Sequence, residues 1–326
     1  MNNFEHADAT TIADAISLLA SNGSSVPIAG GTDLLTQIKL GLIKPGRLVN
    51  LKTIPCLDLI TVVNNGLNIG ALANLDTIAN NSVVRGQYPA LIKAIEVTAS
   101  PQLRNSGTVG ANLAQGPRCW YYRGQFQCWM KGGERCYARN GENSHHAIFG
   151  NGRCNQVHPS DLAPVLIALG AEINIEGIRG RRTIPLSDLF QIPHEGSRQL
   201  TILDPGEIIT MIHLPTPVSG SRSTYFKAME RKVWSFALAS VAVQLVIEDG
   251  VIRNPVIVLG GVAPKPWRLP KSEESLRNQT INREVITAAA ETAVEGAQPL
   301  NANHYKIPLV KGILTEVLSD ILGLNQ

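Results

Sequence analysis

The sequence Val26-Pro27-Ile28-Ala29-Gly30-Gly31-Thr32-Asp33 places a pair of glycines between a predicted strand and a predicted helix. The apolar start is typical of a short strand, and Leu34 to Leu40 of a short helix. Glycines at such a junction let backbone N–H groups approach phosphate oxygens, and a helix start favours an anion. The spacing is neither the G-x-G-x-x-G of a dinucleotide-binding turn nor the G-K-[ST] of a P-loop. Taken alone, the pattern is more often a plain tight turn.

The neighbouring segments predict that this turn belongs to a βαβ-like opening of the chain. Ala9 to Ser21 carries apolar residues at helical spacing, and Arg47 to Leu51 is typical of another strand. From residue 58 the pattern changes to alternating strands, with a hairpin expected around Asn64-Asn65-Gly66. We therefore expect a first layer of mixed strands and helices, followed by a more antiparallel part.

A second glycine-rich stretch, Gly107-Thr108-Val109-Gly110-Ala111-Asn112, also has hydroxyl and amide side chains. We expect it to form a turn, and two such turns raise the odds of a phosphate-bearing ligand. Farther along, Ser160-Asp161 precedes an apolar helix from Leu162 to Leu169. Asp161 is a good N-cap residue, and capping is compatible with a role in ligand binding.

Four of the five cysteines lie within 36 residues, with the spacing C-x8-C-x7-C-x17-C: Cys119, Cys128, Cys136 and Cys154. This is not the pattern of a zinc ribbon or of a bacterial ferredoxin. The surrounding Gly, Arg and Asn residues favour a loop wrapped around a [4Fe-4S] cluster, whose sulfurs such residues can hydrogen-bond. A structural zinc and unrelated free thiols remain alternatives. His145, His146 and His158 flank the group and could replace one thiolate. Cys56 stands apart, and we expect a buried core thiol there.

The composition indicates a globular protein of more than one domain. The chain has 326 residues, 44% of them hydrophobic and 17% charged, with a formal net charge of +3. Such a mild, scattered charge does not indicate nucleic-acid binding. There is no recognisable targeting segment and no run long enough to span a membrane. We therefore expect a soluble, cytoplasmic protein, which a partner with an export signal could carry to the periplasm.

The C-terminal part is expected to form a smaller α+β domain of its own. Thr216 to Ser221 is the best candidate linker. Beyond it, strands are predicted near 223–229, 241–246 and 252–259, followed by two helices near 283–295 and 304–322.

Taken together and in order, these motifs resemble the medium, FAD-binding subunit of molybdenum hydroxylases, the family of xanthine dehydrogenases and aldehyde oxidoreductases. The motifs that carry the resemblance are Ala29 to Leu35, Arg104 to Asn112, Ser160 to Ala163, Gly206 to Pro215, Lys227 with Arg231, and Leu259 to Arg268. An insertion of about 40 residues between Asn112 and Asp161 holds the four clustered cysteines. It resembles the [4Fe-4S]-bearing branch, seen in the FAD subunit of bacterial periplasmic aldehyde oxidoreductase.

The resemblance implies an α+β fold: a two-part FAD-binding domain of the vanillyl-alcohol-oxidase type, then a C-terminal domain of the CO-dehydrogenase-flavoprotein type. It implies an FAD domain over 1–216, with subdomains of about 1–56 and 57–216 and the iron–sulfur insertion at about 115–158, and a C-terminal domain over 221–326.

The same resemblance implies roles for individual residues. Residues 28–35 would wrap the FAD pyrophosphate, and Thr108 to Asn112 would contact the phosphates and ribose from the other side. Asp161 would bind a flavin or ribose hydroxyl, Lys227 would lie near the isoalloxazine ring, and Ile209 would pack on that ring. Lys227 could instead be a solvated strand lysine. The four clustered cysteines would ligate the iron. The full set of expected FAD contacts is Ile28, Ala29, Gly30, Gly31, Thr32, Asp33, Leu34, Leu35, Gly107, Thr108, Val109, Gly110, Ala111, Asn112, Gln115, Asp161, Ile209 and Lys227.

Two departures from the family pattern concern the flavin site. Ala111 stands where many relatives have a second glycine, which is tolerable if its φ is negative. Ser235-Phe236 replaces an acidic residue that is frequent in this part of the family, so the outer face of the flavin is expected to be less charged. This departure argues against direct reduction of NAD.

The expected function is that of an electron-transfer oxidoreductase subunit with no catalytic residue of its own for the organic substrate. The resemblance implies a molybdenum-cofactor-binding large subunit, a [2Fe-2S] small subunit and an external electron acceptor as partners. One rival hypothesis is a stand-alone FAD-dependent oxidoreductase of the vanillyl-alcohol-oxidase-like fold. Its substrate domain would need a catalytic Tyr, His or Arg cluster, which the C-terminal part does not offer. Another rival is a zinc-stapled assembly module without enzymatic activity, which the two glycine turns disfavour.

Overall fold

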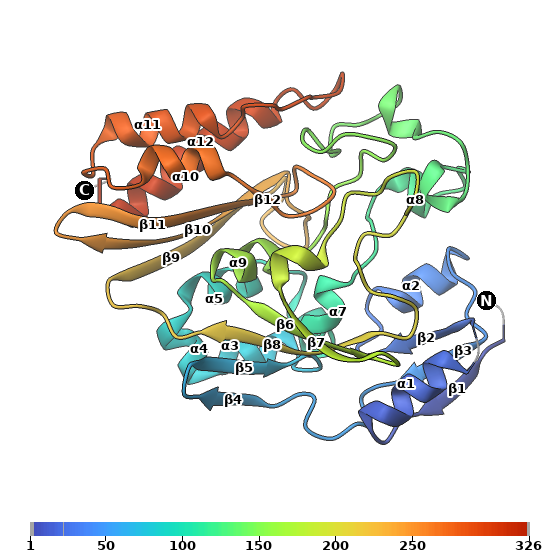
Figure 1. The fold of residues 1–326 in the computed structure, drawn as a ribbon. Coiled ribbons are helices and arrows are strands. Elements are labelled where there is room, and N and C mark those ends of the chain that lie inside the picture. Colours follow the sequence, from blue (N-terminus) through green and yellow to red (C-terminus); the bar gives the residue numbers. More distant parts are fainter. Residues whose placement is uncertain (1–2, 22, 325–326) are drawn as a thin grey trace.

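The computed structural model describes residues 3–21 and 23–324, and it confirms the α+β class. Three sheets organise this part of the chain: three strands at the N-terminus, five in the middle and four in the C-terminal part. Figure 1 shows the first two sheets side by side, with the C-terminal sheet and its helices above them and the cysteine segment at the upper right.

The N-terminal sheet is parallel and carries the first glycine turn. The central strand β3 pairs with β1 on one side and with β2 on the other, both in parallel. Helix α1 is capped by Thr11, whose hydroxyl accepts from the backbone N–H of Asp14 at 3.0 Å. The elements are β1 (Glu5–Asp8), α1 (Ile12–Ala20), β2 (Ser25–Ile28), α2 (Leu34–Lys39) and β3 (Arg47–Asn50). The expected βαβ-like opening is therefore present, with the glycine turn between β2 and α2.

The middle sheet is antiparallel, in the order β4-β5-β8-β6-β7, and helices from two parts of the chain cover it. Its strands are β4 (Ile60–Val63), β5 (Gly66–Gly70), β6 (Glu172–Gly177), β7 (Gly180–Pro185) and β8 (Ile208–Pro215). The helices are α3 (Leu75–Asn80), α4 (Ser82–Gln87), α5 (Pro89–Glu96), α6 (Pro101–Ser106), α7 (Val109–Leu113) and α9 (Leu162–Ala168), with a short 3-10 turn at Leu186–Leu189. Helix α9 is almost wholly buried, so it serves as the core of this unit.

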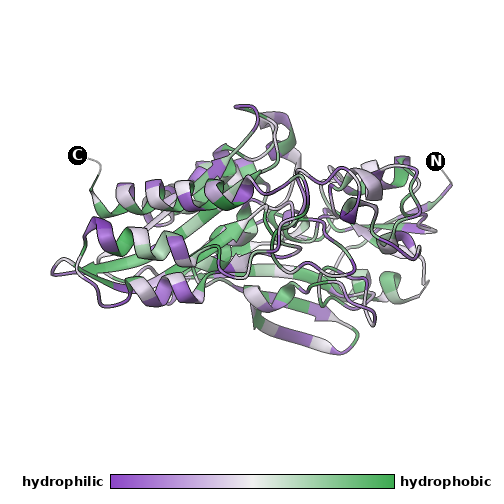
Figure 2. Cartoon of the chain, turned by 90° about the horizontal axis from the view of Figure 1, so that it is seen from above, coloured by the Kyte–Doolittle hydropathy of each residue, from purple (hydrophilic) through white to green (hydrophobic). Residues whose placement is uncertain are grey.

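The C-terminal sheet is antiparallel and is covered on both faces. Its order is β12-β11-β10-β9, and its elements are β9 (Ser221–Ala228), β10 (Ala239–Glu248), β11 (Val251–Gly260), β12 (Trp267–Arg268), α10 (Pro270–Leu276), α11 (Arg283–Thr292) and α12 (Lys306–Leu322). Helices α5 and α9 pack against it from the side of the middle sheet, while α10 and α12 pack on its other side (Figure 1). In Figure 2 the strands are mostly hydrophobic, whereas the helices carry both hydrophobic and hydrophilic residues. This is the pattern expected for a sheet between two helical layers.

The cysteine segment consists mainly of loops, as the sequence predicts, and it packs on the C-terminal domain. It contains only α8 (Trp120–Arg123) and two 3-10 turns at Trp129–Lys131 and Tyr137–Arg139. Ile148 and Phe149 lie in the C-terminal core, and the backbone N–H groups of both donate to the carbonyl of Val262. Lys306 donates to the carbonyls of His145 and Gly261. The later part of the segment therefore packs on the C-terminal domain, although the sequence places the segment within the first domain.

Two expectations for the fold were wrong. Cys56 is exposed and lies in a turn with φ of +66°, so it is not a buried core thiol on a strand edge. A third C-terminal helix, α10, precedes the two expected ones. Its only apolar residue besides Pro270 is Leu276, so it has no apolar stripe that sequence periodicity could detect.

Across the described ranges, none of the helices combines the length and apolarity needed to cross a lipid bilayer. The predicted cytoplasmic location stays a prediction.

A buried histidine predicts how the stability of the chain depends on pH. Burial lowers the pKa of His158 from 6.5 to about 4, and its Nδ1 accepts from the backbone N–H of Ser160. Between these pH values the unfolded chain binds a proton that the folded chain does not, so stability falls as the pH falls from 6.5 to 4. The expected loss is about 3 kcal/mol from this residue. Urea unfolding at pH 7 and pH 4 should show this dependence reduced in His158→Gln and retained in a control at the exposed His6. An equal pH dependence of the unfolding free energy in the wild-type chain, in His158→Gln and in the His6 variant would contradict this prediction.

Candidate functional site

A cavity of about 980 Å³ lies where the two glycine stretches, the cysteine segment and the C-terminal domain meet. This volume is near the upper end of the range for ligand pockets, about 300–1,000 Å³, so the cavity suits a large ligand. Its lining contains Thr32 from the first glycine turn, Thr108 from the second stretch, Cys119 from the cysteine segment and Lys227 from β9. Residues predicted from motifs far apart in the sequence therefore face one space.

The first glycine turn is held against the second glycine stretch by direct backbone contact. A Cβ atom on Gly30 would lie 1.9 Å from the carbonyl oxygen of Ser106, so only glycine fits at this position. The Ser106 hydroxyl also donates to the Gly30 carbonyl at 3.0 Å. Gly31 has φ of +68°, which favours glycine. Gly30 is thus required for packing between the two stretches, whereas we had expected both glycines to serve close approach of phosphate.

The backbone N–H groups of residues 30–33 are available for a ligand. Within the described ranges, none of these four groups donates to a protein acceptor. Successive unpaired backbone N–H groups form an anion-binding concavity. The turn can therefore offer these donors to an anionic group such as a pyrophosphate.

The second glycine stretch is the start of a helix rather than a turn, which corrects our expectation. Thr108 is the N-cap of α7, and its hydroxyl accepts from the N–H of Ala111 at 3.4 Å. The N–H groups of Val109 and Gly110 donate to the carbonyls of Ala73 and Ala71. These N–H groups are occupied, so this stretch can offer a ligand its side chains but few backbone donors. Ala111 has ordinary helical backbone, so its methyl group is tolerated, as expected.

Asp161 and Lys227 form a buried ion pair across the two domains. The Lys227 ammonium lies 2.7 Å from Asp161 Oδ2, and its side chain is only 1% exposed. Tyr225 donates to the other carboxylate oxygen at 2.9 Å, and Thr98 donates to Oδ2 at 3.2 Å. Asp161 makes no capping bond to α9, because the hydroxyl of Ser160 accepts from the N–H of Ala163 instead. Lys227 is therefore not a solvated strand lysine, and Asp161 is not the cap.

Burial dominates the electrostatics of this pair. It raises the pKa of the Asp161 carboxyl above its ordinary value, and the nearby Lys227 ammonium opposes that rise. Burial also raises the pKa of Tyr225, and the Asp161 charge adds to the effect. The Tyr225 hydroxyl therefore stays protonated and can keep donating to Asp161.

The cavity brings most of the expected FAD contacts together. Ile209 on β8 lines it, and so does Gln115, which donates to the carbonyl of Asn112 at 2.9 Å. Four expected contacts lie outside the lining: Ile28, Gly30, Leu35 and Val109. The remaining expected contacts line it: Ala29, Gly31, Thr32, Asp33, Leu34, Gly107, Thr108, Gly110, Ala111, Asn112, Asp161 and Lys227. Sequence reasoning missed Arg118, which also lines the cavity. An arginine next to a cysteine gave no signal of its own.

The four clustered cysteines interact with one another. The thiol of Cys154 is hydrogen-bonded to Cys136, which lowers the pKa of Cys136 to about 5 and raises that of Cys154. Burial raises the pKa of Cys119 to about 11, and Cys136 and Cys128 add to it. The His146 Nε2 atom lies 3.2 Å from Cys119 Sγ, and Asn155 donates to Cys136 Sγ at 3.4 Å. The thiols therefore share one neighbourhood with polar groups around them.

Their arrangement does not form a site for a single metal ion. In the part of the chain that the structure describes, no three His, Cys, Asp or Glu side chains are placed to hold one. Several buried polar atoms around the segment find no hydrogen-bond partner there, including His146 Nδ1, Asn155 Oδ1 and Gln156 Oε1. Unpaired buried polar atoms are costly, so these atoms need partners beyond the protein, either ordered water or a bound group.

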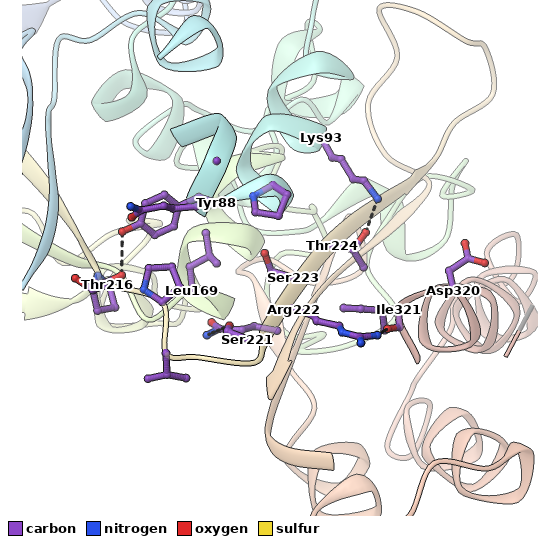
Figure 3. A pocket seen from close by; sticks show the side chains of 17 residues that line it. Tyr88, Lys93, Leu169, Thr216, Ser221, Arg222, Ser223, Thr224, Asp320 and Ile321 are labelled. Carbon is purple, nitrogen blue, oxygen red and sulfur yellow. Dashed lines mark hydrogen bonds between the residues drawn. The ribbon is translucent and has the colours of Figure 1, made fainter. Parts of the chain in front are cut away.

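A second cavity, of about 580 Å³, lies between α4, α5, the linker and β9 (Figure 3). Its polar side chains bond largely to the protein itself. Lys93 donates to the Thr224 hydroxyl at 2.8 Å, Tyr88 donates to the Pro215 carbonyl at 3.0 Å, and Arg222 donates to the Ile321 carbonyl at 2.9 Å. The larger cavity is therefore the better candidate site.

Comparison with known proteins agrees with this geometry. Residues 2–217 match the family model described as the FAD binding domain in molybdopterin dehydrogenase, and residues 224–321 match the CO dehydrogenase flavoprotein C-terminal domain. The chain is 36% identical to the aldehyde oxidoreductase FAD-binding subunit PaoB of Escherichia coli, over 90% of each chain. It is 26% identical to the carbon monoxide dehydrogenase medium chain of Hydrogenophaga pseudoflava, over 91% of this chain and 88% of that one. Among solved structures, reconstituted CO dehydrogenase from Oligotropha carboxidovorans has a similar fold, with a TM-score of 0.80 at 22% identity over 99% of this chain and 98% of that chain.

We predict that breaking the buried Asp161–Lys227 ion pair between the two domains strongly lowers the stability of the folded chain. Asp161→Ala leaves the Lys227 ammonium buried without its partner, so unfolding of the full chain without added cofactor should become easier by about 3–5 kcal/mol. Adding Lys227→Met removes the stranded charge and should recover most of that loss. The control is Lys271→Met, at an exposed ion pair with Glu295, where we expect a change below about 1 kcal/mol. A double variant as unstable as Asp161→Ala alone would show that the stranded charge is not the cause.

Proposed function

The chain belongs to the family of FAD-binding subunits of molybdenum hydroxylases, and from this premise we propose that it binds FAD in the 980 Å³ cavity and relays electrons from a molybdenum-containing partner to an external acceptor. The observation that carries the placement is the turn at residues 30–33, whose four backbone N–H groups lack protein acceptors within the described ranges. Bound FAD supplies the redox chemistry, because flavins exchange electrons singly or in pairs.

The proposed work of the protein is to bind, orient and shield the cofactor. Residues 28–35 hold the pyrophosphate, with the backbone donors of the glycine turn doing most of the binding. Thr108 and Asn112 add side-chain contacts from the facing helix start. Ile209 supplies an apolar surface for the flavin ring, and the Asp161–Lys227 pair sets the charge of the cavity wall near that ring. No residue of this chain is assigned to chemistry on the organic substrate.

The proposed partners follow from the relatives. Their names describe the FAD-binding subunit of an aldehyde oxidoreductase and the medium chain of a carbon monoxide dehydrogenase. We therefore propose a large subunit with a molybdenum cofactor, which oxidises an aldehyde or a related substrate, and a small subunit with [2Fe-2S] clusters, which delivers electrons to this chain. The departure at Ser235-Phe236 favours an acceptor other than NAD.

We further propose that Cys119, Cys128, Cys136 and Cys154 hold a [4Fe-4S] cluster. A single tetrahedral zinc has Zn–S bonds of about 2.3 Å and so needs its sulfurs about 4 Å apart, whereas a four-iron cluster is a larger body ligated by four thiolates at its corners. Cys136 affects the pKa values of both Cys119 and Cys154, so these thiols lie in one region, although the described residues contain no preformed metal site. The side-chain amide of Asn155, which donates to Cys136 Sγ at 3.4 Å, adds support, because the sulfurs of such clusters accept hydrogen bonds from their surroundings.

The glycine turn provides a direct test of FAD binding. In Gly30→Ala the new methyl group would collide with the carbonyl of Ser106, which forces the two glycine stretches apart. The purified variant should retain less than about a tenth of the wild-type flavin content, since a misplacement of the cavity walls affects every contact. The control is Gly86→Ala, where an added Cβ meets no atom within 4 Å, and it should bind FAD normally. Flavin absorbance per chain gives the readout. A folded wild-type chain that takes up no FAD even when saturated would overturn the proposal.

Cysteine substitution tests the cluster separately from FAD. Cys128→Ser, after anaerobic purification of the full chain, should lower iron content and cluster absorbance while FAD stays largely bound. The matched control is Cys56→Ser, at the exposed cysteine outside the segment, and it should keep its iron. Metal analysis decides the outcome: zinc without iron in the wild-type chain would refute a [4Fe-4S] cluster, and so would full iron content in Cys128→Ser.

A further inference from the structure

Arg118 lies between the first glycine turn and the C-terminal domain, and it lines the larger cavity. Its Nη2 atom is 3.1 Å from Asp33 Oδ1, and its guanidinium carbon is 5.0 Å from the centre of the Phe236 ring. Arg118 directly precedes Cys119 and belongs to the insertion that carries the cysteines. One side chain therefore connects the cysteine segment with both walls of the cavity.

The Asp33 carboxylate binds the start of the cysteine segment to the glycine turn. Its carboxylate accepts from the N–H of Gly116 at 2.8 Å and from the side chain of Gln37 at 2.8 Å. It also pairs with Arg123 at 2.7 Å, in addition to Arg118. One negative charge thus faces two guanidinium groups, so the three side chains carry a net charge of +1 beside the turn. A carboxylate that would otherwise repel phosphate is more than neutralised.

The Nε–H group of Arg118 has no hydrogen-bond acceptor. Its Nη2 donates to the side-chain oxygen of Gln115 at 3.0 Å and faces Asp33, but Nε is buried and unpaired among the described residues. Burial lowers the pKa of the guanidinium, although Asp33 opposes this, so the charge is poorly solvated by the protein as it stands. The Nε atom itself is covered by protein atoms, so a ligand in the cavity would meet the accessible part of the Arg118 side chain, which is 28% exposed.

Arg123 differs from Arg118 in the hydrogen bonds that its guanidinium group makes. It pairs with the same carboxylate oxygen, yet its Nε donates to the carbonyl of Pro117 at 2.7 Å and its Nη2 also reaches the carbonyl of Gly116 at 3.4 Å. It does not line the cavity. Arg123 therefore serves the local fold, while Arg118 lines the cavity.

We propose that Arg118 binds the pyrophosphate of FAD through the part of its guanidinium group that is accessible from the cavity, so that the cysteine segment supplies part of the flavin site. This inference rests on the proposed function. Arginine pairs well with phosphate through charge-assisted hydrogen bonds, and the glycine turn that would hold the same group lies next to it. Because Arg118 and Cys119 are neighbours, FAD binding and ordering of the segment are coupled, and each promotes the other to the same degree.

The test compares two arginines that share one carboxylate. In the full chain freed of flavin, Arg118→Gln should weaken FAD binding by about 10–100-fold, as expected for loss of a hydrogen bond to a charged group. Arg123→Gln should weaken it by less than about 3-fold, and Arg118→Lys should recover part of the loss, since it restores the charge without the planar donor. Equal weakening by Arg118→Gln and Arg123→Gln would overturn the proposal, because it would show only a shared structural role on Asp33.

Competition by a second ligand, ADP, tests which part of FAD contacts Arg118. ADP carries the pyrophosphate without the flavin, so Arg118→Gln should weaken ADP competition by about the same factor as it weakens FAD binding. Unchanged competition by ADP would show that Arg118 meets another part of the cofactor and would overturn the assignment. If the wild-type chain binds no FAD, the proposed function fails. If the wild-type chain binds FAD and Arg118→Gln binds it equally well, only this inference fails.

Hydrogen exchange tests the coupling and also controls for folding. Addition of FAD should slow amide exchange in residues 117–131 of the wild-type chain and of Arg123→Gln. In Arg118→Gln, at FAD concentrations that saturate the variant, this protection should be lost while exchange in α9 and β10 stays unchanged. Full protection of residues 117–131 in Arg118→Gln would overturn the coupling.

Discussion

The contact between Gly30 and Ser106 is the constraint on which the rest of the site depends. These residues are 76 positions apart, yet a single methyl group would not fit between them. The contact fixes the first glycine turn against the segment that leads into α7. It therefore fixes the distance between the backbone donors at residues 30–33 and the side chains of Thr108 and Asn112. A cavity wall made of two remote stretches can be rigid only where they touch this closely.

Buried charge holds the C-terminal domain to that wall. The Asp161–Lys227 pair joins α9 to β9, and its desolvation is offset by hydrogen bonds from Tyr225 and Thr98. A second buried lysine, Lys306, bonds the carbonyls of His145 and Gly261, and burial lowers its pKa to about 7. One lysine thus fixes the two domains together, and the other fixes the cysteine segment to the C-terminal domain. Replacing such groups by apolar ones would keep the packing but lose the directional bonds that define how the three parts meet.

The sequence predicted the elements and the order of the motifs because both depend on local patterns. The βαβ-like opening, the hairpin around Asn65 and the apolar helix α9 all follow from periodicity and turn residues. What it could not predict depends on contacts between remote residues. Asp161 looks like a cap, and only the structure shows that Ser160 caps α9 while Asp161 turns to Lys227. The second glycine stretch looks like a turn, but Ala71 and Ala73 take its backbone donors and the helix starts there. Arg118 gave no signal, because its significance comes from Asp33 and Phe236, which lie far away in the sequence.

The position of the cysteine segment explains why an insertion in one domain can serve a site formed by two. Its first residues bond to Asp33 on the glycine turn, and its later residues bond to Asn303 and Lys306 at the start of α12. Between these two anchors lie Cys119, Cys128 and Cys136, and Cys154 follows the second anchor; Cys119 and His146 line the same cavity as the glycine turn. A loop tied at both ends to different domains restricts how those domains can move relative to each other, whatever group it encloses. The segment is therefore part of the architecture of the cavity, and a group bound by Cys119 would lie at the wall of that cavity.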